Sequence, residues 1–282
     1  MSPAYAIAAL SSTLWGGADL LGGLAARRAP APLVAGLSGI TALAILGIGM
    51  PFMPGAPTPA DLAWGAAAGT CGAAGATLMY KALALGPMSL ASPVFSLIGL
   101  CVPVLFGLAA GERPTTIAWL GVALAALAIP LLSTTGEGPG HFPRAHVRRT
   151  LAVSIAAGLV IGWFLVFVAR IGATAGLLPL AFARGVAMAL IGGWYLVRRQ
   201  SLVPAAPARV PALAAGALDS TANVTFLIAV HMAPLVLVSA LVSLAPATTV
   251  LVARFALHER WTRMQGAGLL LALAAGACIS LG

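Results

Sequence analysis

The chain repeats itself at a shift of 147 residues, and this repeat constrains the fold more than any single motif does. Without any gap, Gly69 falls on Gly216 and Pro87 falls on Pro234. The same shift places Pro32–Leu33 on Pro179–Leu180, Ser96–Leu97 on Ser243–Leu244, Glu112–Arg113 on Glu259–Arg260, and Gly121 on Gly268. Alanine- and leucine-rich helices match one another by chance, but here rarer residues keep one spacing over several segments. We therefore expect two structurally equivalent copies.

Each copy contains five long apolar segments. The chain is 61% hydrophobic and 7% charged, whereas a soluble domain is typically ~25% charged. A helix needs roughly 20 apolar residues to cross ~30 Å of hydrocarbon, and it satisfies its own backbone hydrogen bonds. The qualifying segments are about 3–25, 32–53, 62–84, 88–110, 115–133, 150–170, 177–197, 210–231, 234–257 and 263–281.

An odd number of spans in each copy places the two copies in opposite orientations across the membrane. The sequence therefore predicts an all-α integral membrane protein with ten transmembrane helices, arranged as two inverted five-helix repeats. Residues 1–135 form the first repeat, 136–149 a cytoplasmic linker, and 150–282 the second repeat. The linker is rich in Gly and Pro, so its His141 and His146 are expected to be solvated rather than metal ligands.

The net charge of +9 indicates membrane topology rather than nucleic-acid binding. Most Lys and Arg residues fall in loops on one side of the predicted bundle, whereas Arg113 and Arg170 fall on the other. This asymmetry follows the positive-inside rule and predicts contact with anionic lipid headgroups on the basic face. We expect a multi-pass protein of the inner membrane with both termini outside the cytoplasm. Since two fused copies already supply an inverted pair, a monomer is expected.

The chain lacks the residue patterns of a membrane enzyme. It has six acidic residues and no His-Glu-x-x-His, Gly-x-Ser-x-Gly or phosphate-loop motif. Its cysteines, Cys71, Cys101 and Cys278, lie in apolar segments and suggest core residues rather than disulfides or metal ligands. We expect no catalytic residue, no cofactor and no metal. An integral membrane enzyme is the rival class, and a channel would need rings of like polar groups along its pore.

Several short motifs carry a resemblance to a known family. The Leu-Trp-Gly turn at 14–16, and the Gly-Glu-Arg and His-Glu-Arg endings at 111–113 and 258–260, accompany the two five-helix copies. With these motifs and its two five-helix copies, the chain resembles the EamA family of the drug/metabolite transporter superfamily over essentially its whole length. The resemblance implies a ten-helix basket with a central cavity, alternating access, and export of small metabolites such as amino acids. The arginine usual in the second helix of each repeat is present as Arg184, but the first copy lacks it.

Three ionisable residues lie well inside apolar segments, where a charge costs ~2.5–3.5 kcal/mol on insertion scales. They are Asp19, Arg184 and Asp219. From a rise of roughly 1.5 Å per residue, Arg184 and Asp219 differ in depth by less than ~10 Å and are predicted partners. The pair either locks its two helices together or lines the substrate path. Asp19 either lines the same path or reaches the headgroups near Arg27 and Arg28.

The eighth segment has the most polar run of any predicted span. Asp219, Ala222 and Asn223 have i, i+3, i+4 spacing and share one face. Ser220 and Thr221 carry less weight, because their hydroxyls can bond to carbonyls of their own helix. Asn223 is therefore the second candidate for substrate contact in this segment.

Aromatic residues complete the predicted binding site. Trp15 and Trp163 lie in the middle of the first and sixth segments, far from the interfacial belts where tryptophan usually occurs. A wet cavity would satisfy their indole N–H groups, although packing between helices is the alternative. Tyr80, near one end of the third segment, is interpreted as an edge anchor with a possible gating role.

Prolines mark the fourth segment of each copy as a candidate gate. Pro87 and Pro234 open these segments, and Pro93, Pro103 and Pro246 lie inside them. Each internal proline removes a backbone hydrogen bond and favours a kink. The kinks either act as hinges or are fixed by packing.

The predicted charges favour a zwitterionic substrate. Arg184 would meet a carboxylate, and Asp19 or Asp219 would meet an ammonium group. We therefore expect a transporter that exports amino acids. The alternative is a multidrug exporter of cationic amphiphiles, which would bind the same acids and the tryptophans through cation–π contacts.

Overall fold

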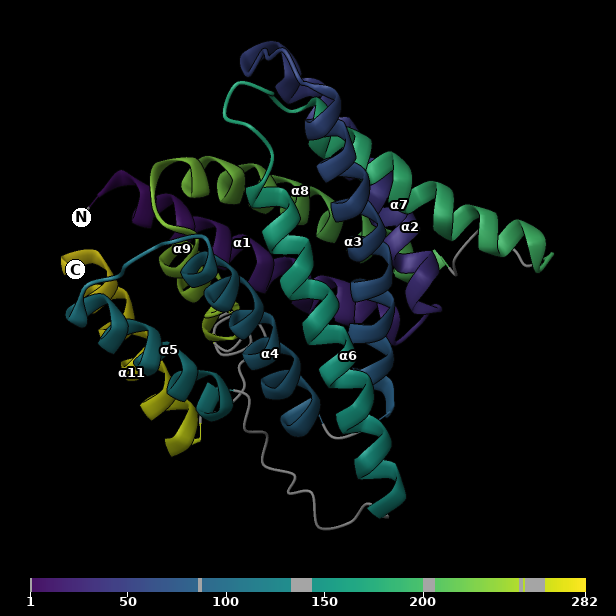
Figure 1. Cartoon of the computed structure of the whole chain (residues 1–282). Helices are drawn as coiled ribbons and strands as arrows, with labels where there is room; N and C mark the ends of the chain where they lie inside the picture. The colour runs from purple at the N-terminus through teal and green to yellow at the C-terminus, as the bar shows by residue number, and fades with distance from the viewer. Residues whose placement is uncertain (1, 86–87, 133–143, 200–205, 249–250, 252–261) are drawn as a thin grey trace.

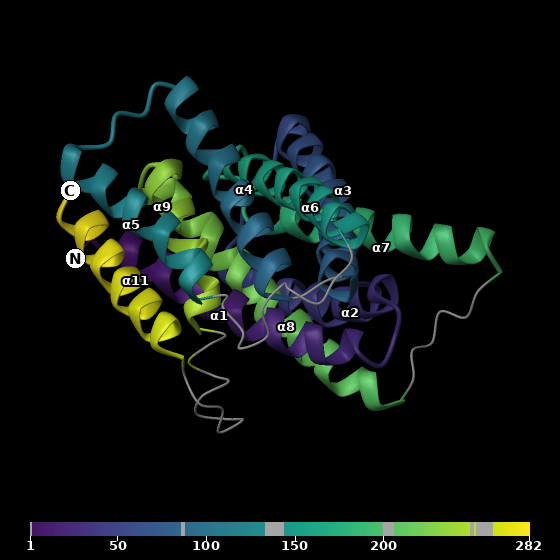
Figure 2. The same cartoon turned by 90° about the horizontal axis from the view of Figure 1, so that it is seen from below.

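The computed structural model describes residues 2–85, 88–132, 144–199, 206–248, 251 and 262–282, and all secondary structure among them is helical (Figure 1). The two termini lie on the same side of the molecule, next to α5 and α11 (Figures 1 and 2). The elements are α1 (Pro3–Ala26), α2 (Ala31–Gly49), the 3₁₀ helix η1 (Met50–Phe52), α3 (Pro59–Leu85), α4 (Met88–Ala109), α5 (Thr116–Leu132), α6 (Arg144–Ala169), α7 (Leu178–Val197), α8 (Ala206–Met232), α9 (Leu235–Val242) and α11 (Arg263–Leu281).

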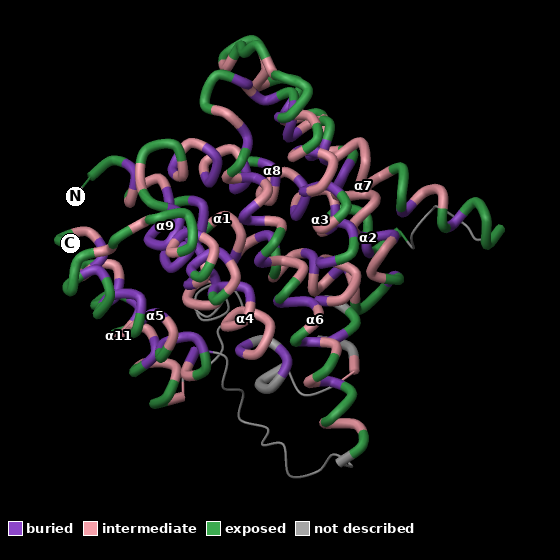
Figure 3. Tube along the Cα trace, viewed as in Figure 1, coloured by how far each residue is buried: buried purple, intermediate pink, exposed green. Residues whose placement is uncertain are grey.

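Five of the described helices have the length and composition of membrane spans. Large apolar side chains such as Leu105 and Leu270 are 65% and 69% exposed, and exposed positions run along the outer helices (Figure 3). Helices surrounded by lipid have such surfaces, because hydrocarbon takes the place of water. The helices long and apolar enough to cross a bilayer are Ala31–Phe52, Ala145–Ala169, Leu178–Val197, Ala206–Met232 and Arg263–Leu281, with shorter apolar helices at Pro93–Ala109, Thr116–Leu132 and Leu235–Thr248.

Helices from the two halves of the chain pack in matched pairs. α1 packs along α8 as α6 packs along α3, and α2 contacts α8 as α7 contacts α3. In addition, α2 contacts α7, α4 contacts α9, and α5 lies along α11 (Figures 1 and 2). A shift of 147 residues turns the α1–α8 contact into the α6–α3 contact, and the α2–α8 contact into the α7–α3 contact. The same shift maps each of the pairs α2–α7, α4–α9 and α5–α11 onto itself. The packing therefore follows the sequence repeat.

The core lies between two three-helix layers. In one layer α6 lies between α3 and α4, and in the other α1 lies between α8 and α9. Buried side chains from both layers meet in one apolar cluster, which includes Leu165 and Val168 of α6, Ala8 of α1 and Phe226 of α8. The faces of α1 and α6 that carry these residues are therefore their inner faces.

The start of α6 differs from the sequence prediction. The helix begins at Arg144, whereas the span was predicted from residue 150 and residues 136–149 were expected to be a linker. Residues 144–149 contain neither Gly nor Pro, and Ala and Arg are among the strongest helix formers. The basic cluster therefore forms the first turns of α6. Residues 136–143 lie outside the part of the chain that the structure describes.

The ninth predicted span is interrupted. α9 ends at Val242, residues 243–244 form a turn, and residues 245–248 are helical again. Pro246 explains the break, because it lacks the N–H that would bond to the Val242 carbonyl four residues earlier. The Ser12 hydroxyl of α1 lies 3.4 Å from that carbonyl and donates to it instead. The helix is therefore interrupted just before Pro246, and the role of Pro246 as a hinge stays a prediction.

The other hinge prolines within the described residues, Pro93, Pro103 and Pro234, do not break a helix. Pro93 and Pro103 lie within continuous α4, and Pro234 is the N-cap residue of α9. Pro87 lies outside the described residues. Their role in gating stays a prediction.

Two repeat-equivalent glycines allow the closest helix crossings between the halves. A Cβ on Gly69 of α3 would lie 2.2 Å from the Ala183 carbonyl oxygen of α7. A Cβ on Gly216 of α8 would lie 2.1 Å from the Ser38 carbonyl oxygen of α2. Small residues permit such backbone contact, which is a main source of helix association in lipid. The two crossings are equivalent under the repeat.

We predict that Gly69→Ala and Gly216→Ala each destabilise the fold. The added methyl group must push two backbones apart, which costs about 1–3 kcal/mol. Chemical unfolding in detergent measures this cost. Gly192→Ala is the control, because nothing lies within 4 Å of a Cβ at that glycine. Equal stability of all three variants would show that these crossings are loosely packed.

Candidate functional site

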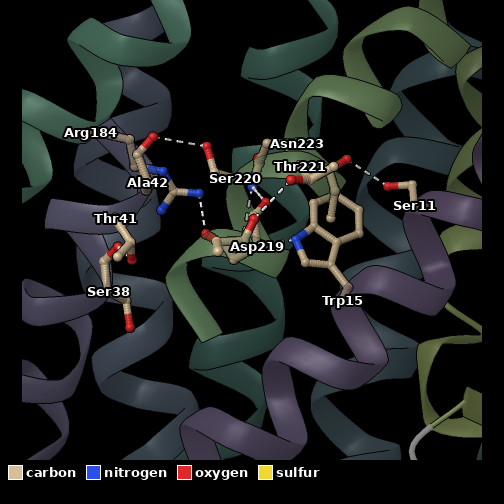
Figure 4. A network of polar contacts seen from close by, with 12 residues as sticks. Ser11, Trp15, Ser38, Thr41, Ala42, Arg184, Asp219, Ser220, Thr221 and Asn223 are labelled. Carbon is tan, nitrogen blue, oxygen red and sulfur yellow. Dashed lines mark hydrogen bonds and ion pairs between the residues drawn. The ribbon is translucent and has the colours of Figure 1, made fainter. Parts of the chain in front are cut away.

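The carboxylate of Asp219, in the middle of α8, is surrounded by three donors (Figure 4). Its Oδ1 accepts hydrogen bonds from Trp15 Nε1 of α1 at 2.9 Å and from Asn223 Nδ2 at 3.2 Å. Its Oδ2 accepts from Arg184 Nη2 of α7, with which it forms an ion pair. The Trp15 ring packs on buried Phe226, with 5.5 Å between centroids. Three helices therefore meet at one carboxylate.

Asn223 lies one helical turn after Asp219 and supports it in two ways. Its Nδ2 donates to the Asp219 backbone oxygen at 2.7 Å as well as to the carboxylate. The residue is 2% exposed, and among the described residues its Oδ1 has no hydrogen-bond donor. A buried oxygen without a donor costs about 1–3 kcal/mol. This oxygen is therefore available to a donor that enters the site.

The Arg184–Asp219 pair is neutral and partly shielded. The two side chains are 22% and 29% exposed. Arg184 also borders a cavity of about 10 Å³ together with Ala68, Gly69 and Phe164, which is space for about one water molecule. Opposite charges in contact avoid most of the cost of placing either one alone inside a membrane bundle. The pair is therefore stable without a bound substrate.

Asp19 adds a second carboxyl group, which forms no ion pair with any described residue. It lies one turn beyond Trp15 on α1, so it shares the face that carries Trp15 to Asp219. Its side chain is exposed, and it makes no ion pair with Arg27 or Arg28. The site and its edge therefore contain two acidic residues, Asp19 and Asp219, and one cation, Arg184, which pairs with Asp219.

Hydroxyl side chains fix the surrounding helices to one another. Ser11 Oγ of α1 donates to the Ala222 carbonyl at 2.7 Å, and Ser220 Oγ of α8 donates to the Ala42 carbonyl at 3.1 Å (Figure 4). The Ser220 hydroxyl therefore bonds to α2 and not, as the sequence allowed, to a carbonyl of its own helix. Two more bonds join α2 to α8, Ser38 Oγ to Ala212 O and Thr41 Oγ1 to Leu213 O.

The structure places Trp163 away from this site. Trp163 is 42% exposed and lies two residues before buried Leu165, so it points away from the inner face of α6. Its neighbours are Phe106 of α4, with 6.2 Å between ring centroids, and Phe167 at 5.5 Å. Trp163 therefore belongs to a separate aromatic cluster on the outer side of α6.

The predicted binding residues whose side chains are described occupy three kinds of position relative to Asp219. Four of them form the network at Asp219, Asp19 adjoins it, and Trp163 lies apart. Tyr80 belongs to α3, but its side chain lies outside the described part of the chain. A role of Tyr80 at the edge or in gating stays a prediction.

Segments at the end of the bundle far from the start of α6 are joined by bonds from side chains to backbone. Glu112, after α4, accepts hydrogen bonds from Leu235 N at 2.8 Å and Val236 N at 2.9 Å in the first turn of α9. A carboxylate at a helix N-terminus is favourable because it meets free N–H groups. Asp61 of α3 likewise accepts from Gly172 N at 2.7 Å. Further contacts here are His231 Nε2 with Ile171 O at 2.7 Å and Ala56 N with Thr174 O at 2.9 Å.

Comparisons with known proteins give a family and a fold. The model of the EamA-like transporter family matches residues 2–134, which confirms the resemblance over the first half of the chain. A solved structure described as "Crystal structure of protein" has a TM-score of 0.80 and 19% sequence identity, over 100% of this chain and 97% of that chain. This low identity shows a shared fold alone. No curated protein matches significantly. The matched family consists of EamA-like transporters.

We predict energetic coupling between Arg184 and Asp219. A double-mutant cycle with Arg184→Gln and Asp219→Asn measures it through the free energy of unfolding. Exposed pairs contribute ~0.2–1 kcal/mol, and breaking a buried pair costs ~3–5 kcal/mol. Because both side chains are partly exposed, we expect a coupling of about 1–3 kcal/mol, between these ranges. A coupling near zero would mean that the two charges are independently solvated.

We predict that Glu112→Gln loosens the first turn of α9. A Gln side chain has one acceptor oxygen in place of two, so one of the two amides loses its partner. Hydrogen–deuterium exchange of the peptide around Leu235 and Val236 should become faster. Arg113→Gln is the control, because Arg113 bonds only to the backbone oxygen of its neighbour among the described residues. Equal exchange in both variants would exclude Glu112 as the group that closes this end.

Proposed function

We propose that this chain is a secondary transporter that exports small metabolites across the inner membrane by alternating access, as its match to the EamA-like transporter family over residues 2–134 suggests. In this proposal ten spans form two inverted five-helix repeats, residues 1–135 and 150–282, around a central substrate site. Amino acids are the first candidate substrates. The protein acts as a monomer and uses no cofactor.

The network at Asp219 is the observation that carries this proposal. Trp15 and Asp19 come from the first copy, and Arg184, Asp219 and Asn223 come from the second. In transporters built from repeats, the substrate site lies at the interface between the repeats, because both halves must move around it. The matched packing of helices from the two halves supports the same arrangement.

The charge distribution supports a substrate with a protonated amine. Arg184 already pairs with Asp219, whereas Asp19 has no cationic partner among the described residues. An ammonium group at the site could donate to the Asp19 carboxyl group, and it could donate to the Asn223 oxygen that has no partner among the described residues. Amino acids carry this group. Their carboxylate would reach Arg184 by competing with Asp219.

One observation favours a second candidate function, the export of cationic amphiphiles. Arg184 is engaged by Asp219, so a substrate without a carboxylate leaves the ion pair intact. The ring of Trp15 at the same site offers an aromatic face for a cation. The two candidates therefore differ in whether the substrate carboxylate contributes to binding.

The closed end of the bundle supports alternating access. Glu112 and Asp61 join separate helices at one end, while the Asp19 side chain is exposed. In our proposal this is a state with one end closed. Transport would break the bonds at Glu112 and Asp61 while the opposite end closes over the substrate.

Counterflow in proteoliposomes tests the proposed function. Vesicles loaded with unlabelled phenylalanine should accumulate labelled phenylalanine, and phenethylamine, which lacks the carboxylate, should compete weakly. Counterflow of labelled phenethylamine, with none of labelled phenylalanine, would select the cationic-amphiphile candidate. Downhill flux of labelled phenylalanine without any counterflow would indicate a channel, and chemically altered substrate would indicate an enzyme.

We predict that Asp19→Asn reduces amine transport. A hydrogen bond to a charged group contributes about 1.5–3 kcal/mol, so the apparent affinity in counterflow should fall about 10- to 100-fold. Asp19→Glu keeps the charge and should retain most of the affinity. If Asp19→Asn transports like the unmodified protein, the amine is not recognised by this carboxylate.

A further inference from the structure

The aromatic cluster around Trp163 lines a groove between α3 and α6. The groove has a volume of about 310 Å³ and is bordered by Cys71 of α3 and by Leu159, Val160, Trp163 and Phe167 of α6. These side chains offer the groove almost only apolar atoms. The groove is separate from the network at Asp219.

This groove opens to the outside of the bundle. Leu159 and Trp163 are 46% and 42% exposed, whereas Leu165 on the opposite face of α6 is buried. α6 is long and apolar enough to cross a bilayer, so its exposed face meets hydrocarbon rather than water. Lipid acyl chains are therefore the molecules that lie against this groove.

A cation lies at one end of the groove. Arg170 directly follows α6 and is exposed, and its guanidinium carbon is 5.6 Å from the centre of the Trp64 ring. Trp64 in turn stacks on Phe167, with 5.9 Å between ring centroids. No carboxylate among the described residues forms an ion pair with Arg170. A continuous aromatic surface thus joins the groove to a guanidinium group without a partner acid.

The distance between the two ends of the groove matches the hydrocarbon thickness of one lipid leaflet. At ~1.5 Å per residue, α6 rises roughly 16 Å from Leu159 to Arg170. Half of a hydrocarbon core of ~30 Å is about 15 Å. An acyl chain that starts at the level of Arg170 would therefore end near Leu159, close to the midplane.

We propose that this groove binds an anionic phospholipid, with its acyl chain along Trp163 and Phe167 and its phosphate on Arg170. Stacking on Trp64 holds the guanidinium plane while its N–H groups remain free to bind the phosphate. Only one cation contacts the headgroup, so the site selects anionic over zwitterionic lipid moderately. The site is independent of the proposed transport function.

Photo-crosslinking tests this site. The full chain is placed in bilayers that contain phosphatidylglycerol or phosphatidylcholine with a diazirine in the acyl chain, and the labelled peptides are identified by mass spectrometry. Peptides containing Cys71 and residues 159–167 should be labelled, about fivefold more by phosphatidylglycerol, since one basic residue near the surface contributes ~1 kcal/mol.

Variants of Arg170 test whether this residue causes the preference for phosphatidylglycerol. Arg170→Gln should reduce the ratio of phosphatidylglycerol labelling to phosphatidylcholine labelling to about one. Arg170→Lys should keep most of this preference. Arg198→Gln is the matched control, because Arg198 also stacks on a tryptophan, at 4.7 Å from the Trp194 ring, but at another helix. An unchanged ratio in Arg170→Gln, a ratio near one in the unmodified protein, or labelling confined to other helices would each overturn the proposal.

Discussion

A carboxylate halfway along an apolar helix is stable only if donors surround it, and Asp219 has an indole, an amide and a guanidinium around it. Because these donors come from α1, α7 and α8, the carboxylate fixes how helices from the two halves of the chain meet. Hydroxyl groups such as those of Ser11 and Ser220 reinforce the same helix contacts by bonding to neighbouring backbones. The candidate site and the packing of the bundle therefore depend on the same interaction.

The repeat explains which features are shared and which are not. Gly69 and Gly216 occupy equivalent crossings, and both permit backbone contact that a side chain would prevent. The charged residues break this symmetry, since Arg184 and Asp219 come from the second copy and Asp19 from the first. A symmetrical scaffold with an asymmetrical centre is consistent with a transporter whose two halves move alike but hold one substrate.

The sequence predicted the depth of a side chain along its helix better than the neighbouring helix that the side chain faces. The pairing of Arg184 with Asp219 followed from depth and charge alone, because few other buried groups were available. Trp163 was assigned to the same site because it lies mid-span, but its depth does not tell which neighbour it faces. Only the packing of α6 between α3 and α4 turns it outward.

Other features depended on contacts between distant segments. The bonds from Glu112 to the start of α9, and from Ser38 and Thr41 of α2 to α8, have no local signal, since their partners lie more than a hundred residues away along the chain. The break after Val242 was better predicted, because Pro246 removes a backbone donor wherever it occurs. Effects of a residue on its own helix could therefore be predicted from the sequence, whereas hydrogen-bond partners on other helices could not.

The central claim is that the two ends of this bundle open alternately around the Asp219 site. Electron–electron distance measurements test it with one spin-label pair at residues 113 and 232, across the closed end, and a second pair at residues 28 and 148, across the other end. The account predicts that a transported substrate shifts the two distances in opposite directions, one lengthening as the other shortens. If both distances lengthen together, or neither responds to a substrate that shows counterflow, the alternating-access account is contradicted.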